Sequence, residues 1–474
     1  MSKNILIIVA DDMGQEQLEV YGTNLNADNY PSTPNIHALT QRGLRFTRAY
    51  TQPWCSPTRA EVLTGSYGFQ TGIGNLADRQ NQPLLETEVC LPLGLKQATE
   101  NGYATALIGK HHLSTNLAWG GAYEHPVRIG FDYWAGTLLN FLGTGGEGYY
   151  SWNRTVSYRK GSKIVVETAP CITYTGLQNV QDALAWIADQ TKPWFMQFAF
   201  NLPHAPFTRP PAYMYDTAKW DLPTYRPETG GDARPYYKAM IESMDYCIGL
   251  LFAGIPQDVL ANTVVIFTSD NGTPDDVIDP EYIPYNTPNH FKNSPYEEGI
   301  RNPLIVAGPG VFTGGAVNTS ALVKTIDIYR TVIDIAGGDY ALVSVNPEHG
   351  RPSISYWPVC TGATTTARSV IWTDNFSPNG PNLNCSTLGS RCLVQLQYKI
   401  IRDRSTGVGG WPASPIGTGN STDKLFDLKT DPLEQTNLIA GSFSLTALEP
   451  THPGIVSAYN SLVASYATWT STYA

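Results

Sequence analysis

Carboxylate and amide side chains stand directly after two apolar runs of the sequence. Asp11 and Asp12 follow residues 4–10, and Asp270 and Asn271 follow a later run of the same kind. Two adjacent carboxylates repel each other unless a cation neutralises them, and oxygen ligands suit a hard ion such as Ca²⁺ or Mg²⁺. We therefore expect these four residues to hold one divalent cation. The alternative is structural: an Asp that caps a helix, and an Asp-Asn-Gly turn.

A cysteine lies in a second reactive stretch, residues 54–59, with the sequence WCSPTR. An unmodified Cys55 would be a soft nucleophile, useful only if the pKa of its thiol were lowered. Pro57 favours the first turn of a helix, and Arg59 lies four residues beyond the cysteine, so one helical turn returns its guanidinium toward residue 55. A structural helix cap is the other interpretation of this pentapeptide.

Lysine and histidine side chains follow two further apolar runs. Lys110, His111 and His112 come after residues 102–108. Alternate residues of an extended segment point to the same side, so we expect Lys110 and His112 to face the site together and His111 to point away. His204 is flanked by prolines, which would hold its backbone, and a histidine titrates in the range that suits a general acid.

The elements that must position these groups are four buried strands. Residues 4–10, 102–108, 194–200 and 262–268 are continuous, apolar and rich in β-branched or aromatic residues. Such runs are typical of strands that are buried on both faces in a mostly parallel sheet. Open α/β sheets place their ligands at the carboxyl ends of strands. Since polar groups follow each of the four runs, we expect one shared site.

The segments that carry these groups resemble the signatures of the type I, formylglycine-dependent sulfatases. They occur in the order that this family has them and cover most of the chain. The matching segments are CSPTR at 55–59 with TG at 64–65, GKHHL at 109–113, PHAP at 203–206, KNSPYEEGIRNP at 292–303, and residues 424–438. The sequence departs from the family pattern at Glu298, where glycine is usual, and at Asn302, so we expect a local backbone adjustment there.

The resemblance implies a chemistry for residue 55. In the family the cysteine is oxidised during synthesis, by a formylglycine-generating maturation enzyme, to Cα-formylglycine. One hydroxyl of the hydrated aldehyde attacks the sulfur of a sulfate ester, and the other later expels sulfate. By the resemblance, Cys55 also supplies an oxygen to a single divalent ion, Ca²⁺ with Mg²⁺ as the alternative, beside Asp11, Asp12, Asp270 and Asn271.

The resemblance also implies roles for the cationic residues. Arg59 and the metal favour the alkoxide form of the diol, while Lys110, Lys292 and His204 neutralise the sulfuryl oxygens. His204 or Lys292 protonates the departing oxygen. His112 takes the proton of the second hydroxyl.

The fold implied by the resemblance is that of the alkaline phosphatase superfamily. It is an α/β fold with a large mixed, mostly parallel sheet between helices and a small C-terminal α+β subdomain. We expect a catalytic domain over 1–365 and a C-terminal subdomain over 366–474, with short antiparallel strands and a final helix near 453–468. Residues 113–161 are rich in Gly, Trp and Tyr, and we expect them to be loop-like and to line the substrate pocket.

Composition excludes several function classes. The chain has 474 residues, a net charge of −10 and a pI near 5.3, which disfavours nucleic acid as a partner. It has no polybasic patch and no apolar run of about 20 residues, so no membrane partner is expected. Met1 leads directly into a strand, which leaves the protein either cytoplasmic or secreted with its leader removed. The seven cysteines show no zinc-site spacing.

The sequence leaves the alcohol part of the substrate open. Aryl, carbohydrate and alkyl sulfate esters all fit, and the Tyr and Trp content slightly favours aryl or carbohydrate esters. Two other functions stay open as well. One is hydrolysis of a phosphate or phosphonate monoester on the same fold, and the other is sulfate binding without catalysis if Cys55 is never modified.

Overall fold

The computed structural model describes most of the chain. The described residues are 2–22, 27–78, 81–114, 121–141, 148–227, 230–280, 290–312, 314–344, 350–380, 388–403, 423–440 and 445–473.

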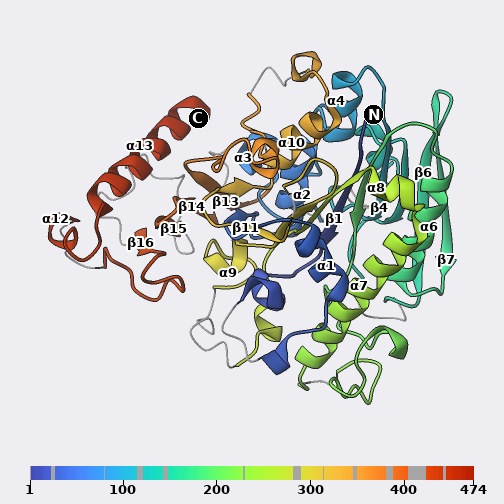
Figure 1. Ribbon diagram of the computed structural model, residues 1–474, viewed down its shortest axis with the longest axis horizontal. Helices are drawn as coiled ribbons and strands as arrows, with labels where there is room; N and C mark the ends of the chain where they lie inside the picture. The colour runs from blue at the N-terminus through green and yellow to red at the C-terminus, as the bar shows by residue number, and fades with distance from the viewer. Residues whose placement is uncertain are drawn as a thin grey trace.

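A ten-stranded sheet forms the centre of the molecule (Figure 1). Its strands, in spatial order, are β11 (Ala316–Asn318), β2 (Gly43–Phe46), β10 (Leu304–Ala307), β9 (Thr263–Ser269), β1 (Asn4–Ala10), β8 (Trp194–Ala199), β4 (Ala104–Lys110), β5 (Tyr133–Thr137), β6 (Trp152–Lys160) and β7 (Lys163–Cys171).

The middle of the sheet is parallel and its edges are mixed. Strands β9, β1, β8, β4 and β5 all run in the same direction, whereas β10 and β6 pair antiparallel with their neighbours β9 and β5. Val9 pairs with both Thr268 and Ala199, so β9, β1 and β8 end at the same level of the sheet. The expected large, mixed and mostly parallel sheet is confirmed.

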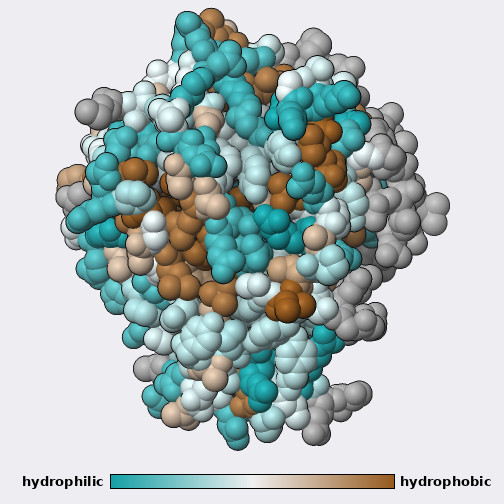
Figure 2. All heavy atoms as spheres, turned by 90° about the vertical axis from the view of Figure 1, so that its right-hand side faces the viewer, coloured by the Kyte–Doolittle hydropathy of each residue, from teal (hydrophilic) through white to brown (hydrophobic). Residues whose placement is uncertain are grey.

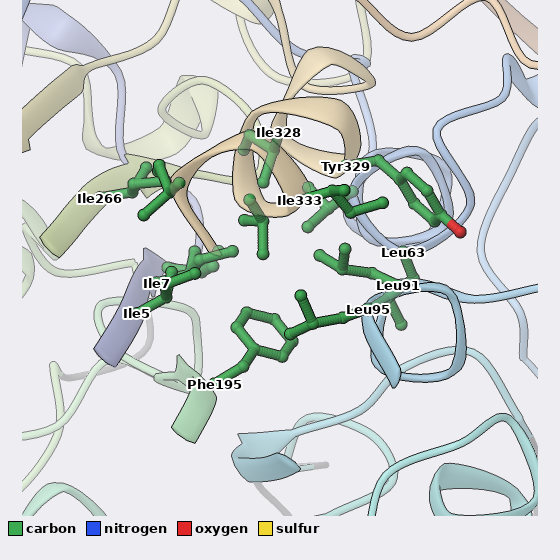
Figure 3. Packing of buried hydrophobic residues seen from close by; sticks show 14 of the residues in the cluster. Ile5, Ile7, Leu63, Leu91, Leu95, Phe195, Ile266, Ile328, Tyr329 and Ile333 are labelled. Atoms are coloured by element: carbon green, nitrogen blue, oxygen red, sulfur yellow. The ribbon is translucent and has the colours of Figure 1, made fainter. Parts of the chain in front are cut away.

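Helices cover both faces of the sheet because successive residues of β1 point to opposite sides. Ile5 and Ile7 belong to one buried cluster, and Leu6 and Ile8 belong to the other. Figure 3 shows the first cluster, in which apolar side chains of strands and helices converge. Its helices are α2 (Cys55–Thr64), α4 (Leu91–Ala98) and α10 (Asp327–Ala336). The opposite face is covered by α1 (Pro34–Arg42), α6 (Thr175–Ala188) and α7 (Arg234–Gly254).

A separate four-stranded antiparallel sheet lies in the C-terminal part. It consists of β13 (Ile371–Ser377), β14 (Leu388–Val394), β15 (Tyr398–Asp403) and β16 (Asp423–Asp427), and helix α13 (Ile455–Tyr473) packs on it. Ile400 faces α13, whereas its neighbour Ile401 faces the large sheet's domain. The small sheet and terminal helix are confirmed, while the boundary at residue 365 stays a prediction.

Part of the stretch expected to be a loop is regular structure. The described residues of 113–161 contain α5 (His125–Arg128), β5 and β6, and β6 continues into β7 through a turn at Gly161, whose φ is +63°. Much of this hairpin is exposed, so its strands lack the continuous apolar runs of β1 and β8. Figure 2, which looks onto the side of the molecule where β6 and β7 lie, shows a mainly hydrophilic surface that apolar patches interrupt.

Gly43 directly follows helix α1 but does not adopt the left-handed conformation of a helix cap. Helix α1 stops at Arg42, and Gly43 is extended and already belongs to β2. A Cβ at Gly43 would lie 2.2 Å from the carbonyl oxygen of Val306 in β10. The glycine therefore permits the close approach of two strands.

The remaining elements are short. The described strands and α-helices not yet named are β3 (Ala49–Tyr50), α3 (Gly68–Thr71), α8 (Gln257–Ala261), α9 (Glu297–Ile300), β12 (Val323–Lys324), α11 (Trp357–Cys360) and α12 (Leu445–Leu448). Across the described part of the chain, no helix combines the length and apolarity needed to cross a bilayer.

Candidate functional site

Two strand ends bring the predicted carboxylates together. Asp11 and Asp12 directly follow β1, and Asp270 and Asn271 directly follow its parallel neighbour β9. The backbone N–H of Asp12 donates to Asp270 Oδ1 over 3.1 Å, and Asn271 Nδ2 donates to Asp12 Oδ1 over 2.7 Å. These bonds fix the two ends against each other, and all four residues are buried.

Asp12 has a left-handed backbone that a distant helix supports. Its φ is +69°, which is unfavourable for a residue with a Cβ. The hydroxyl of Tyr237 in α7 donates to the carbonyl oxygen of Asp12 over 2.7 Å, and Ser269 Oγ accepts the backbone N–H of Met13. Nothing in the sequence around Tyr237 marks this role, because the bond joins residues 225 positions apart.

Two buried cations, Lys110 and Arg59, and the partly buried Lys292 balance the three carboxylates. Lys110 Nζ lies 2.7 Å from Asp11 Oδ2, and Lys292 Nζ lies 2.6 Å from Asp12 Oδ2. The guanidinium of Arg59 donates twice to one oxygen of Asp270, from Nε over 3.0 Å and from a terminal nitrogen over 2.7 Å. The second partner of that terminal nitrogen is Asp11 Oδ1, at 3.6 Å.

Cys55 begins α2 and points into this cluster. Its Sγ lies 3.6 Å from Asp11 Oδ1 and 3.7 Å from Asp12 Oδ1. Burial raises the pKa of the Cys55 thiol well above its ordinary value, and the charge of Asp270 adds to this effect. The unmodified thiol is therefore protonated at neutral pH and is not a thiolate nucleophile.

His204 and Lys292 form a pair at the more exposed side of the cluster. Lys292 Nζ lies 3.4 Å from His204 Nε2, while His204 Nδ1 donates to the carbonyl oxygen of Ala205 over 2.6 Å. Burial lowers the pKa of His204 to about 3, although the charge of Asp12 opposes the shift. The neutral ring thus presents an unprotonated Nε2 to Lys292. The hydroxyl of Tyr149 donates to the backbone oxygen of His204 over 2.6 Å and holds this segment.

His112 reaches the site by a turn of the backbone. Strand β4 ends at Lys110, and His112 is left-handed, with a φ of +55°, so strand alternation does not account for its position. Its carbonyl oxygen accepts a hydrogen bond from Ser56 Oγ over 2.7 Å, which ties it to α2. Burial lowers the pKa of His112, and the charges of Lys110 and Arg59 lower it further.

His111 points away from the cluster, as expected. Its Nε2 lies 2.8 Å from Nδ1 of His125, and its ring packs 6.3 Å from that of Trp134. The side chains of the adjacent residues His111 and His112 therefore lie in different environments.

The donor atoms fit a hard divalent cation. Asp11, Asp12, Cys55 and His204 each present a donor atom within 4.8 Å of the others. The side-chain oxygen of Asn271 is buried and has no hydrogen-bond partner among the described residues. Burial of such an oxygen costs free energy unless it binds a cation. Carboxylate and amide oxygens are the ligands that Ca²⁺ and Mg²⁺ prefer.

The predicted ligand set and the observed group differ in three residues. Asn271 lies outside the four-residue group, which contains carboxylates, a thiol and an imidazole but no amide. Asp270 also lies outside this group, although it is close to Asp11: burial and then the charge of Asp270 raise the pKa of Asp11. His204 lies inside the group, and the sequence assigned it only to sulfate and the leaving oxygen. In total the structure brings the ten predicted residues together, namely Asp11, Asp12, Cys55, Arg59, Lys110, His112, His204, Asp270, Asn271 and Lys292.

Comparison with known proteins gives the family. The profile of the family described as Sulfatase matches residues 3–338. A protein named Sulfatase from Formosa agariphila is 29% identical over 505 residues, covering 94% of this chain and 86% of that protein. N-acetylgalactosamine-6-sulfatase from Homo sapiens is 30% identical over 357 residues, covering 70% of this chain and 62% of the human protein.

A solved structure shares the fold. The crystal structure of Ps i-CgsB in complex with k-i-k-neocarrahexaose matches 100% of this chain and 94% of its own, with a TM-score of 0.69 and 21% identity. The profile match spans well over half of the sequence and contains the residues that meet around Cys55. The chain therefore belongs to the type I sulfatase family of the alkaline phosphatase superfamily and is a sulfuric ester hydrolase.

Proposed function

We propose that this sulfatase hydrolyses carbohydrate sulfate monoesters, with residue 55 converted to Cα-formylglycine and one divalent cation, Ca²⁺ in preference to Mg²⁺. The observation that carries the proposal is the position of Cys55. Its Sγ lies within 3.7 Å of two carboxylates, where a thiolate would be repelled. An oxygen-bearing group at this place would instead be a ligand that a hard cation accepts.

The cation and the hydrated formylglycine would supply an activated oxygen nucleophile. Asp11, Asp12 and Asn271 would hold the ion, with Asp270 beside them. Lys110 and Lys292, which lie against Asp11 and Asp12, would bind the sulfuryl oxygens, where charge shifts in the transition state.

Lys292 is the better of the two candidates for protonating the leaving oxygen. The ring proton of His204 is on Nδ1, where it bonds to the Ala205 carbonyl, so Nε2 can only accept. The ammonium of Lys292, 3.4 Å away, carries the available proton. His204 would orient this ammonium and accept a hydrogen bond from it.

His112 would accept the proton of the second hydroxyl. Its imidazole is buried and neutral, because burial and the nearby cations disfavour a further charge. Its Nδ1 finds no hydrogen-bond partner within the described ranges. A neutral imidazole has a nitrogen lone pair that can accept a proton.

A carbohydrate alcohol is supported by the relatives. The human relative is named for N-acetylgalactosamine 6-sulfate chemistry, and the structural neighbour was solved with neocarrahexaose. Aryl sulfates are the competing class, since the sequence favours both.

The test combines mass spectrometry with turnover. The protein is produced together with a formylglycine-generating enzyme, and peptide mass spectrometry shows whether residue 55 is an aldehyde or a thiol. Sulfate release is then measured for sulfated N-acetylhexosamines and 4-nitrophenyl sulfate, and release of the alcohol is measured for phenyl phosphonate esters. We expect an aldehyde, and the highest kcat/KM on a sulfated sugar. An unmodified thiol in an active protein contradicts the mechanism, and faster turnover of the phosphonate contradicts the substrate class.

Cys55→Ala is expected to lower turnover by about 10³-fold or more, because the nucleophile is lost. The matched control is Cys171→Ser, a half-buried thiol on β7 far from the site, which should retain full turnover. Both variants should unfold at nearly the temperature of the parent protein. Near-normal sulfate release by Cys55→Ala would refute the assignment.

A further inference from the structure

Trp54 is the residue before the nucleophile position and is more exposed to solvent than Cys55. It directly precedes Cys55, and its carbonyl oxygen accepts the N–H of Thr58 over 3.3 Å where α2 begins. Cys55 is 1% exposed, whereas Trp54 is only partly buried. The indole is thus fixed on the backbone that carries the nucleophile but reaches further outward.

The ring of Trp54 borders the cation that we assign to the leaving oxygen. Lys292 Nζ lies over the ring, 5.9 Å from its centroid. The N–H of Asn293 donates to the carbonyl oxygen of Pro53 over 3.0 Å, so the two segments are joined next to this contact. An ammonium over an indole face is attracted by the ring, and the contact keeps Trp54 and Lys292 together.

The accessible side of the site is the side of Trp54. The side chains of Lys110 and Arg59 are 0% and 1% exposed, while those of Lys292 and His204 are 11% and 20% exposed. A sulfate group placed among these cations must therefore point its alcohol part toward Lys292 and His204. The ring of Trp54 stands there.

The indole also carries an N–H that needs an acceptor. Trp54 Nε1 is buried and has no hydrogen-bond partner among the residues that the structure describes. A buried donor without an acceptor is unfavourable, and a ligand oxygen would satisfy it. The donor and the ring face together match a sugar, which offers an apolar C–H face and hydroxyl oxygens.

We propose that Trp54 determines substrate specificity by forming one wall of the site for the alcohol part of the ester. Its ring packs against the ring of the substrate, and its N–H donates to a hydroxyl or ring oxygen. This inference rests on the proposed carbohydrate substrate and adds the residue that would recognise it.

The test compares ring-bearing and ring-free esters in the formylglycine-containing enzyme. Trp54→Leu removes both the ring and the N–H, and Trp54→Phe keeps a ring but removes the N–H. The substrates are a sulfated N-acetylhexosamine, 4-nitrophenyl sulfate and ethyl sulfate. The matched control is Trp357→Leu, since Trp357 is also partly buried beneath a lysine, with Lys3 Nζ 5.4 Å from its ring centroid.

We expect Trp54→Leu to lower kcat/KM about tenfold for the two ring-bearing esters relative to ethyl sulfate. Trp54→Phe should lower kcat/KM for the sugar sulfate but not for 4-nitrophenyl sulfate, and Trp357→Leu should change none. Equal losses on all three substrates in the Trp54 variants would overturn the inference and leave the sulfatase function standing. If Trp54→Leu does not fold, Trp54→Phe decides, because an unchanged sugar-to-aryl ratio contradicts the proposal. A parent enzyme that is active only on 4-nitrophenyl sulfate contradicts the proposed carbohydrate function itself.

Discussion

At the scale of single residues, the site is a nearly balanced set of buried charges. Asp11, Asp12 and Asp270 face three cations at short distances. Burial of unpaired charges is very costly, so each cation is held by a carboxylate until a competing charge enters. A divalent cation and a sulfate group are such competitors, because one draws the carboxylates and the other draws the ammonium groups. The same residues can thus serve folding and binding.

Asn271→Ala should weaken the cation site without unbalancing the charges. The substitution removes the buried side-chain oxygen and the hydrogen bond to Asp12 Oδ1. In the parent protein, calcium at 100 times its Kd should stabilise the fold by about 2.7 kcal/mol, seen as a rise in Tm in a calcium titration. We expect this rise to be largely lost in Asn271→Ala. Asn262→Ala, at the other end of β9, is the control, and an equal calcium effect in both variants would contradict the ligand assignment.

Glu61 should make stability depend on pH. Burial raises the pKa of this carboxyl from 4.5 to about 7, even though Lys324 lies 3.1 Å away. An acid with a raised pKa in the folded state stabilises the fold below its unfolded pKa and loses this contribution as pH rises. The free energy of unfolding should fall by about 3 kcal/mol between pH 4.5 and 7 from this group.

The measurement for Glu61 is urea unfolding across this pH range in the parent and in Glu61→Gln. Glutamine keeps an oxygen that can accept the hydrogen bond of Thr325, but it cannot titrate. The free energy of unfolding of the parent protein should therefore fall, relative to that of Glu61→Gln, as the pH rises from 4.5 to 7. A constant difference would mean that the pKa of Glu61 is not raised.

At the scale of elements, the parallel strands bring the site residues together, and helix α7 supports one of these residues by a hydrogen bond. The carboxyl ends of β1, β9 and β8 lie at one level because the strands are in register. The left-handed Asp12 then requires support that the sheet does not give, and Tyr237 supplies it from α7. The geometry of a metal ligand therefore depends on a helix far away in the sequence.

Tyr237→Phe tests this dependence. Loss of the hydrogen bond to the Asp12 carbonyl should cost about 1 kcal/mol of stability and lower calcium affinity about tenfold, as for other residues that orient metal ligands. Calorimetric calcium titration measures the second effect. Tyr236→Phe is a matched control from the same helix, because its hydroxyl bonds to Thr224 instead. Equal calcium affinities in the two variants would show that Tyr237 does not position Asp12.

The elements that the sequence predicts well are those whose environment is uniform. Strands β1, β8 and β9 are buried on both faces, so their apolar runs are continuous and their ends are marked by polar residues. Strands β6 and β7 were not predicted because much of the hairpin is exposed, so neither strand is a continuous run of buried apolar residues. The support from Tyr237 could not be predicted, since a single hydroxyl in a helix leaves no pattern. Motif spacing located the site residues, but their roles stay predictions.

At the scale of the whole molecule, the C-terminal sheet is tied to the segment that carries Lys292. Lys399 of β15 lies 3.1 Å from Glu297 of α9 and 2.9 Å from Glu434, and all three side chains are buried. Asn375 of β13 donates to the carbonyl oxygen of Asn293 over 3.4 Å. In Figure 1 the C-terminal helix lies at one end of the molecule, opposite the β6–β7 hairpin. The small sheet between that helix and the large sheet is thus part of the support of the site.

Lys399→Met should destabilise the whole chain and disturb the site. It leaves two buried carboxylates without their shared cation, which costs about 3–5 kcal/mol. Since the cores of the two parts are continuous through Tyr50 and Ile401, we expect one calorimetric transition in both parent and variant. The KM for the sulfate ester should rise as well. Lys96→Met, which breaks a partly exposed pair with Asp132, should cost under about 1 kcal/mol.

A parent protein with two separate transitions would contradict this view and would favour independent domains that meet near residue 365. An unchanged KM in folded Lys399→Met would show that the ion pairs serve stability alone.

The burial of Cys55 has a consequence for how the enzyme is made. At 1% exposure beneath the ends of the central strands, the thiol is out of reach of any other protein once the chain has folded. If residue 55 is oxidised enzymatically, the reaction must precede folding and compete with it in time. Fast recombinant synthesis with too little maturation enzyme would then yield well-folded, permanently inactive molecules, and the specific activity of a preparation would report the conditions of its biosynthesis.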